Sequence, residues 1–125
     1  MHWSDSYINI PHDVLDCAQL VERVLQEQFD RIDIHFPRRQ TDDLAHRSAL
    51  ITDHQADFAE RIEEPVDGCG VLMLARGRQA HIGLYCLIQG VPYVLHSDAL
   101  FGSSMRQPLA RLPRCYRVEG FYQWL

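Results

Sequence analysis

Three short runs rich in β-branched and aromatic residues follow one another in the middle of this 125-residue chain. The runs cover residues 71–75, 80–88 and 91–96. Residues 76–79 and 89–90 separate them, and separators this short join antiparallel neighbours. The sequence therefore predicts a three-stranded antiparallel meander, and the run at residues 116–121 predicts a further strand.

One amphipathic helix is predicted ahead of the meander. Between residues 13 and 29 no glycine or proline occurs, and apolar side chains recur at the spacing of one helix face. These side chains belong to Cys17, Leu20, Val21, Val24, Leu25 and Phe29. Either Asp13 or Asp16 can serve as the N-cap, so Cys17 lies in the first turn and faces inward.

A helix followed by a sheet indicates an α+β fold. Residues 45–62 carry further helix-forming residues and predict one or two short helices, and a turn at residues 66–70 closes that region. The length is that of one ordinary domain, so we expect residues 1–125 to form a single unit.

Charge and hydropathy argue against two classes of partner. The net charge is −5 with His neutral, and no basic stripe interleaved with aromatic residues occurs, so nucleic-acid binding is not expected. The longest apolar run, residues 71–75, is too short to cross a bilayer, so we expect no membrane insertion. The N-terminal segment lacks the pattern of a signal peptide, and we therefore expect synthesis in the cytoplasm.

The four cysteines do not form a metal-binding pattern. They stand at positions 17, 69, 86 and 115, and no two of them make a CxxC pair. The seven histidines show no spacing typical of a zinc site. We therefore expect neither a metal nor a cofactor.

Cys17, His81 and His96 form the one constellation with catalytic potential. A hairpin that turns at residues 89–90 places His81 and His96 nearly opposite each other at one end of the sheet, as a base and its orienting partner require. A helix N-terminus and a nearby imidazolium both favour the thiolate form of Cys17. A helix that packs with its N-terminus at the same end brings Cys17 to His81. The other interpretation is an inert core cysteine and two histidines at strand ends.

Five segments of the chain carry short motifs in a fixed order. They are Tyr7-Ile-Asn-Ile-Pro-His12 with Asp16-Cys17-Ala-Gln-Leu-Val21, then Phe36-Pro-Arg-Arg-Gln-Thr41, residues 64–74, His81-Ile-Gly-Leu-Tyr85 and Tyr93-Val-Leu-His96. Together they resemble the NlpC family of papain-like cysteine peptidases, whose histidine motif reads His-Val-Gly-Ile-Tyr. The resemblance implies a papain-like NlpC fold, in which an N-terminal nucleophile helix packs on a small antiparallel sheet.

The resemblance also implies residue roles. The implied catalytic residues are Cys17 as nucleophile, His81 as its base and His96 as the residue that orients the base. The backbone N–H of Cys17 would stabilise the oxyanion. His12 or Tyr7 would replace a tyrosine that assists there in the family. Gln19 stands where the family has glycine, which narrows the cleft or alters specificity.

The family hydrolyses amide bonds in peptidoglycan stem peptides, and the resemblance implies this substrate here. A chain without wall-binding modules resembles the peptidases of bacteriophage and prophage tails, which are carried in the virion among tail-tip proteins and open the cell wall at infection. Two alternatives stay open. One is an amidase effector of a secretion system, and the other is a catalytically silent structural protein of the tail tip.

Overall fold

A computed structural model describes residues 1–34, 59–76 and 79–125 of the chain. In that part it contains one α-helix, two short 3-10 helices and six strands. In chain order these are η1 (Trp3–Tyr7), α1 (Cys17–Gln28), β1 (Ala59–Ile62), β2 (Gly70–Ala75), β3 (Gln79–Ile88), β4 (Val91–Asp98), β5 (Ser103–Pro108), η2 (Leu109–Arg111) and β6 (Tyr116–Trp124).

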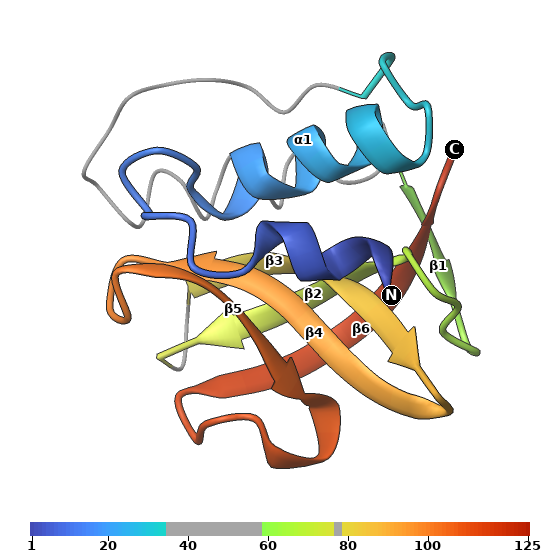
Figure 1. The fold of residues 1–125 in the computed structure, drawn as a ribbon. Helices are drawn as coiled ribbons and strands as arrows, with labels where there is room; N and C mark the ends of the chain where they lie inside the picture. Colours follow the sequence, from blue (N-terminus) through green and yellow to red (C-terminus); the bar gives the residue numbers. More distant parts are fainter. Residues whose placement is uncertain (35–58, 77–78) are drawn as a thin grey trace.

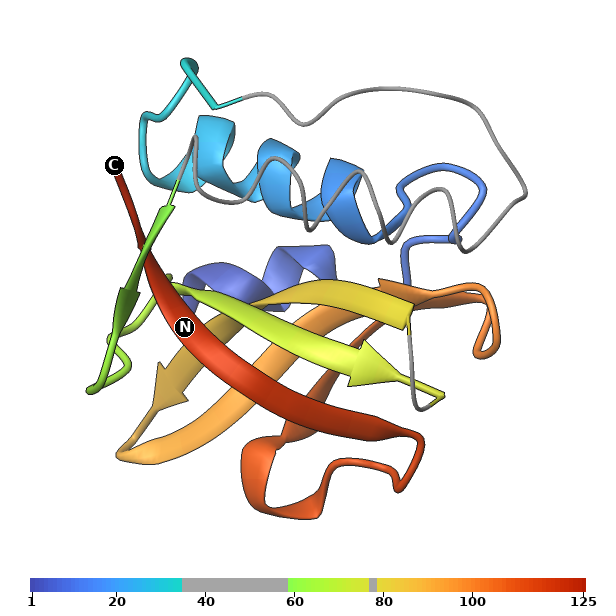
Figure 2. The same cartoon turned by 180° about the vertical axis from the view of Figure 1, so that it is seen from behind.

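The six strands form one antiparallel sheet in the order β1-β6-β2-β3-β4-β5. The strands β2, β3 and β4 are consecutive neighbours, as the meander predicts. The last strand, β6, lies between β1 and β2 and so carries the C-terminal segment back across the sheet (Figure 2). The helix α1 covers one face of the curved sheet (Figure 1).

The prediction of a papain-like α+β fold is wrong. The described residues form six strands and a single α-helix, which makes this a predominantly β fold. Sequence patterns missed β1 and β5, which are the two edge strands of the sheet. Edge strands bury little, so neither shows the apolar alternation from which strands are recognised. Part of the region predicted as helical, Ala59–Ile62, is the strand β1. Residues 45–58 and the motif at residues 36–41 lie outside the described residues.

The predicted helix, meander and last strand agree with the structure. The predicted meander corresponds to β2, β3 and β4, and the run at residues 116–121 is the first part of β6. A turn at residues 66–69 precedes β2, in which the N–H of Cys69 donates to the carbonyl of Val66. Gly68 has a φ of 86° there, and the ring of Phe29 occupies the place of any Cβ at that residue. A glycine is therefore required both for the turn and for the helix end to pack against it.

The sheet has a buried cluster on each face. One cluster lies between α1 and the sheet, and its buried members include Leu20, Val21, Val24, Leu25, Ile82, Leu84 and Leu95. The other contains Cys69, Val71, Met73, Ala75, Tyr85, Val94 and Tyr116. Successive side chains of a strand point to opposite faces. In β3, Ile82 and Leu84 therefore face α1, whereas His81 and Tyr85 face the other way.

The start of α1 is fixed by a reciprocal cap. Asp16 is the N-cap, and its carboxylate accepts a hydrogen bond of 2.9 Å from the N–H of Gln19. The side-chain oxygen of Gln19 accepts in turn from the N–H of Asp16 at 3.0 Å. This capping box satisfies amides that have no partner within the helix. Cys17 is therefore the first residue of α1, as predicted.

The cap gives a prediction of stability. Replacing Asp16→Ala should lower the free energy of unfolding by about 1 kcal/mol, because the N-terminal amides of α1 lose their acceptor. Asp13→Ala removes the same charge from an exposed position before the helix and is the matched control, expected to change stability by less than about 0.5 kcal/mol. Urea denaturation of both variants measures the difference. Equal losses would show that the charge matters and the cap does not.

Candidate active site

His81 and His96 meet at one end of the sheet. Nε2 of His81 lies 2.9 Å from Nδ1 of His96, within hydrogen-bond distance. The rings are edge to face, with centroids 5.0 Å apart. His81 is 5% exposed and His96 is fully buried. The predicted proximity of the two histidines is therefore confirmed.

The register of β3 and β4 explains this contact. Their pairing runs from Ile88↔Val91 to Leu84↔Leu95 and ends there. Continued by one pair, the same register sets His96 opposite Gly83, so His81 is a diagonal neighbour of His96 on the same face. A Cβ at Gly83 would lie 2.8 Å from the carbonyl oxygen of Leu95 and 3.2 Å from Cβ of His96. Glycine at this position lets β4 approach closely and brings His96 within reach of His81.

The pair continues to Gln107 on β5. Nε2 of His96 lies 2.7 Å from Oε1 of Gln107. Gln107 pairs with Val94, and Met105 with His96, so Gln107 stands on the same face as the histidines and one diagonal step from His96. Three side chains from three adjacent strands thus form one hydrogen-bonded row.

A second group of polar side chains borders the histidines. The ring of Tyr116 stacks on His81 with centroids 5.4 Å apart and meets His96 edge to face at 4.9 Å. Its hydroxyl donates to Oδ2 of Asp98 at 2.5 Å, and Nη1 of Arg76 donates to the same oxygen at 3.0 Å. Burial opposes the ionisation of Asp98, but hydrogen bonds from Tyr116, a backbone amide and Arg76 outweigh it and lower the pKa of Asp98 to about 2.

Burial decides the charge of the histidines. It lowers the pKa of His81 to about 3, and the neighbouring His96 acts in the same direction, while the Asp98 carboxylate opposes them. Burial also lowers the pKa of His96, against the hydrogen bond to Gln107 and the charge of Asp98. Both rings are therefore neutral at pH 7.

Cys17 lies at the same end of the sheet as the histidines. Figure 1 shows that α1 begins above the end of β4 and the start of β3. The hydroxyl of Ser97 donates to the carbonyl of Leu15 at 2.9 Å, which ties the segment before α1 to the residue next to His96. Cys17 itself is half-buried and packs against the cluster between α1 and the sheet. The histidines point to the other face, so contact between Cys17 and His81 stays a prediction.

Tyr7 and Gln19, two other residues of the predicted site, make contacts that were not predicted. The hydroxyl of Tyr7 donates to Glu27 at 2.8 Å, ten residues beyond Cys17 and so about 15 Å further along α1. The structure therefore places Tyr7 away from the nucleophile. Gln19 caps the helix through its side chain, and its part in specificity stays a prediction. The motif Asp-x-x-Gln from Asp16 already carries that capping signal.

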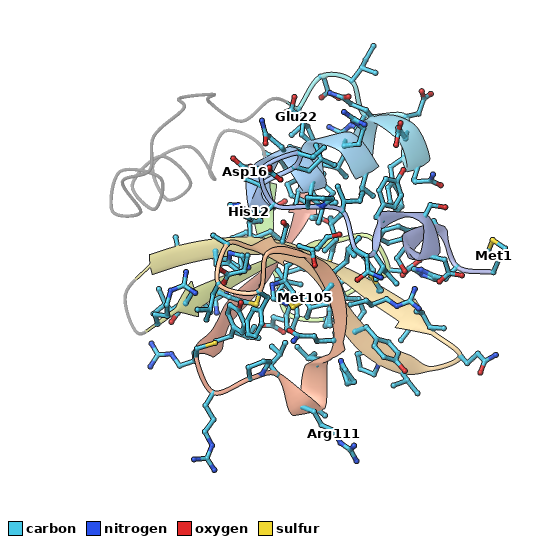
Figure 3. All side chains as sticks on the ribbon, turned by 60° about the vertical axis from the view of Figure 1, so that its left-hand side comes forward. Met1, His12, Asp16, Glu22, Met105 and Arg111 are labelled. Carbon is cyan, nitrogen blue, oxygen red and sulfur yellow. The ribbon has the colours of Figure 1, made fainter. Side chains whose placement is uncertain are left out.

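His12 lies close to the predicted site. It sits between the start of α1 and the sheet (Figure 3). Its N–H donates to the carbonyl of Gly102 at 3.0 Å, which holds the segment before α1 against the turn between β4 and β5. A charge on His12 is near enough to disfavour protonation of His81. Between Tyr7 and His12, the geometry thus favours His12 as the assisting residue.

Three groups near the pair were not predicted, namely Gln107, Asp98 and Tyr116. The alternation of β4 already puts Asp98 on the face of His96, so this residue could have been found from the strand pattern. Gln107 could not, because β5 has no apolar alternation. Tyr116 reaches the pair from β6, which pairs with β2, and nothing in the sequence indicates that order.

Other kinds of site find little support in the described part of the chain. No group of three or more His, Cys, Asp or Glu side chains there could hold a metal ion. Nor is any helix of that part long and apolar enough to cross a membrane. An open cavity of about 440 Å³ lies beside Tyr7, Arg23 and Glu27, and its lining does not include the histidines.

The lowered pKa values predict a loss of stability in mild acid. A histidine with a folded pKa below its unfolded value of about 6.5 favours the unfolded state as the pH falls through that value. We expect the free energy of unfolding to drop by up to roughly 2 kcal/mol between pH 7 and pH 5 through His81, and further through His96, measured by urea denaturation at each pH. The carboxylate of Asp98 loses its contribution only below about pH 4, outside this range.

The variants His81→Gln and His96→Gln test the origin of this slope. Each removes one titrating ring and keeps a polar side chain, so each should flatten the dependence of stability on pH between 7 and 5. A slope that stays at the wild-type value in both variants would assign the acid sensitivity to other groups.

Comparison with known proteins leaves the site to be interpreted from its own residues. No protein-family model matches the chain. No curated protein and no solved structure shows a significant match to it.

Proposed function

We propose that this protein is a cysteine hydrolase of peptide amide bonds, in which Cys17 is the nucleophile and His81 the base. The observation that carries the proposal is the 2.9 Å contact of His81 with His96 at the end of the sheet where α1 begins. An imidazole held by a second, fixed side chain has the arrangement of a general base and its orienting partner. A cysteine at a helix N-terminus is a suitable nucleophile for such a base.

The reaction would proceed in two stages. The reaction requires Nδ1 of His81 to meet the thiol of Cys17 around the end of the sheet, because the two side chains leave its opposite faces. The sulfur of Cys17 would attack the amide carbonyl carbon while the thiol proton moves to Nδ1 of His81. The C–N bond breaks, this proton passes to the leaving amine, and a thioester remains on Cys17. Water then gives a proton to His81 as its oxygen adds to the thioester, and the acid leaves as the thiol is restored. N–H groups of the first turn of α1 stabilise the oxyanion in both stages.

The neutral resting state of the histidines affects the first stage. The sequence favours an imidazolium beside Cys17, whereas burial lowers the pKa of His81 far below neutral pH. The thiol proton would therefore transfer during the attack and not before it. The imidazolium formed in this way is stabilised by the negative charge of Asp98, which raises the proton affinity of His81.

We propose peptidoglycan stem peptides as the substrate and the tail tip of a bacteriophage or prophage as the setting, with action at the bacterial cell wall. The five motifs between residues 7 and 96, in their order, support both. A secretion-system effector would use the same chemistry. Tail genes next to the gene of this protein would favour the first setting, and an adjacent immunity gene would favour the second.

The burial of the histidines favours a second candidate function. His96 is fully buried and His81 nearly so, and two buried imidazoles that satisfy each other can serve the fold alone. In that case the protein is a catalytically silent structural component, and the experiments below give no hydrolysis.

Hydrolysis is tested with purified peptidoglycan. Wild-type protein should release new amino groups, and Cys17→Ala and His81→Gln should release none above background. His96→Gln should lose about 10²–10⁴-fold, because an orienting group contributes less than the groups that make and break bonds. Cys115→Ala should keep full activity. If the wild type releases no amine from any wall preparation, the silent structural function is correct.

Thiol reactivity gives a test that needs no substrate. Brief treatment with iodoacetamide at pH 7, followed by peptide mass spectrometry, should label Cys17 first because a helix N-terminus favours its thiolate. Cys69 and Cys86 are buried, and burial raises the pKa of both thiols, that of Cys86 to about 12. Cys115 is half-buried like Cys17 and is the matched control. Labelling of Cys17 no faster than of Cys115 would contradict a catalytic role.

A further inference from the structure

The two hydrogen bonds that link His81, His96 and Gln107 run in one direction, because each histidine donates to the next side chain of the row. An amide oxygen only accepts hydrogen bonds, so the contact between Oε1 of Gln107 and Nε2 of His96 requires a proton on that nitrogen. A neutral imidazole carries one proton, so Nδ1 of His96 has a lone pair and accepts. The contact at Nδ1 of His96 then requires a proton on Nε2 of His81. By the same rule, Nδ1 of His81 is the nitrogen with the lone pair.

We propose that Gln107 is a positioning residue that sets the tautomer of both histidines and so leaves Nδ1 of His81 as the basic nitrogen. Its amide acts through His96 and does not touch the reacting atoms. Were the amide nitrogen turned toward His96, every proton in the row would shift to the other ring nitrogen. Nδ1 of His81 would then carry a proton and could not accept one from a thiol.

The surroundings hold the row in this arrangement. Gln107 lies on β5, whose six residues pair with β4 from Tyr93↔Pro108 to Asp98↔Ser103. His96 is fully buried, so no water competes for its two nitrogens once both are bonded. Tyr116 packs on both rings and limits their rotation. The neutral state that burial imposes is also required, because a doubly protonated ring has no tautomer to select.

Two substitutions of Gln107 distinguish the effect of its hydrogen-bond acceptor from the effect of its size. Gln107→Glu keeps an acceptor at the same length and cannot donate when ionised, so both tautomers should persist. Gln107→Leu keeps similar bulk and removes the acceptor, so Nε2 of His96 loses its partner. If the side chain only filled space, Gln107→Leu would be the milder change, since it introduces no charge.

The tautomers are read by NMR of protein labelled with ¹⁵N at histidine, at pH 7.5. His81→Gln and His96→Gln assign the two rings. In the wild type and in Gln107→Glu we expect Nε2 protonated and Nδ1 unprotonated in both rings, with a slowly exchanging proton on Nε2 of His96. Gln107→Leu should lose that proton signal and show mixed tautomers of His96. A proton on Nδ1 of either ring in the wild type, or unchanged spectra in Gln107→Leu, would overturn the inference.

The catalytic consequence of Gln107 rests on the proposed function, whereas the NMR result does not. With hydrolysis established, Gln107→Leu should lower kcat at least ~10-fold with little change in KM, and Gln107→Glu should retain activity within about 10-fold. An equal loss of kcat in Gln107→Leu and Gln107→Glu would overturn the positioning role, even if NMR showed the expected tautomers. If no wild-type hydrolysis occurs while the tautomers follow Gln107, the proposed function fails and the tautomer assignment stands.

Discussion

The hydrogen bond between His81 and His96 is the interaction on which the rest of this end of the molecule depends. Two imidazoles are buried there, and each of their three bonded nitrogens would cost on the order of 1–3 kcal/mol if it lost its partner. The cost is avoided only if β3, β4 and β5 hold their register, because His96 must reach His81 on one side and Gln107 on the other. Gly83 allows the close approach that this register needs.

The same register places the helix. Because side chains alternate along β4, Leu95 and Ser97 face α1 while His96 faces away. Leu95 belongs to the cluster under the helix, and Ser97 holds the carbonyl of Leu15 just before the helix begins. The position of Cys17 at the end of the sheet that carries the histidines therefore follows from one strand. A shift of β4 by one residue would exchange the two sets of side chains and remove both features at once.

Local patterns explain how much of this was predictable. The helix, its cap at either Asp13 or Asp16 and the hairpin that brings His81 to His96 depend on residues close in sequence, and all three could be predicted. The fold class could not, because the edge strands β1 and β5 bury little and the insertion of β6 beside β2 is a long-range pairing. Gln107 belongs to β5, so the partner that orients His96 was missed together with its strand.

The last constraint is electrostatic, and it makes the protonation state of His81 at rest different from its state during a reaction. Asp98 keeps its negative charge because Tyr116 and Arg76 both donate to it, and it lies near the two neutral rings. The carboxylate of Asp98 raises the proton affinity of His81, but the burial of the ring outweighs it, so His81 is neutral at rest. Once a proton arrives from a neighbouring group, the same carboxylate stabilises the cation. An arrangement of this kind suits a base that acts during bond formation better than a permanent ion pair.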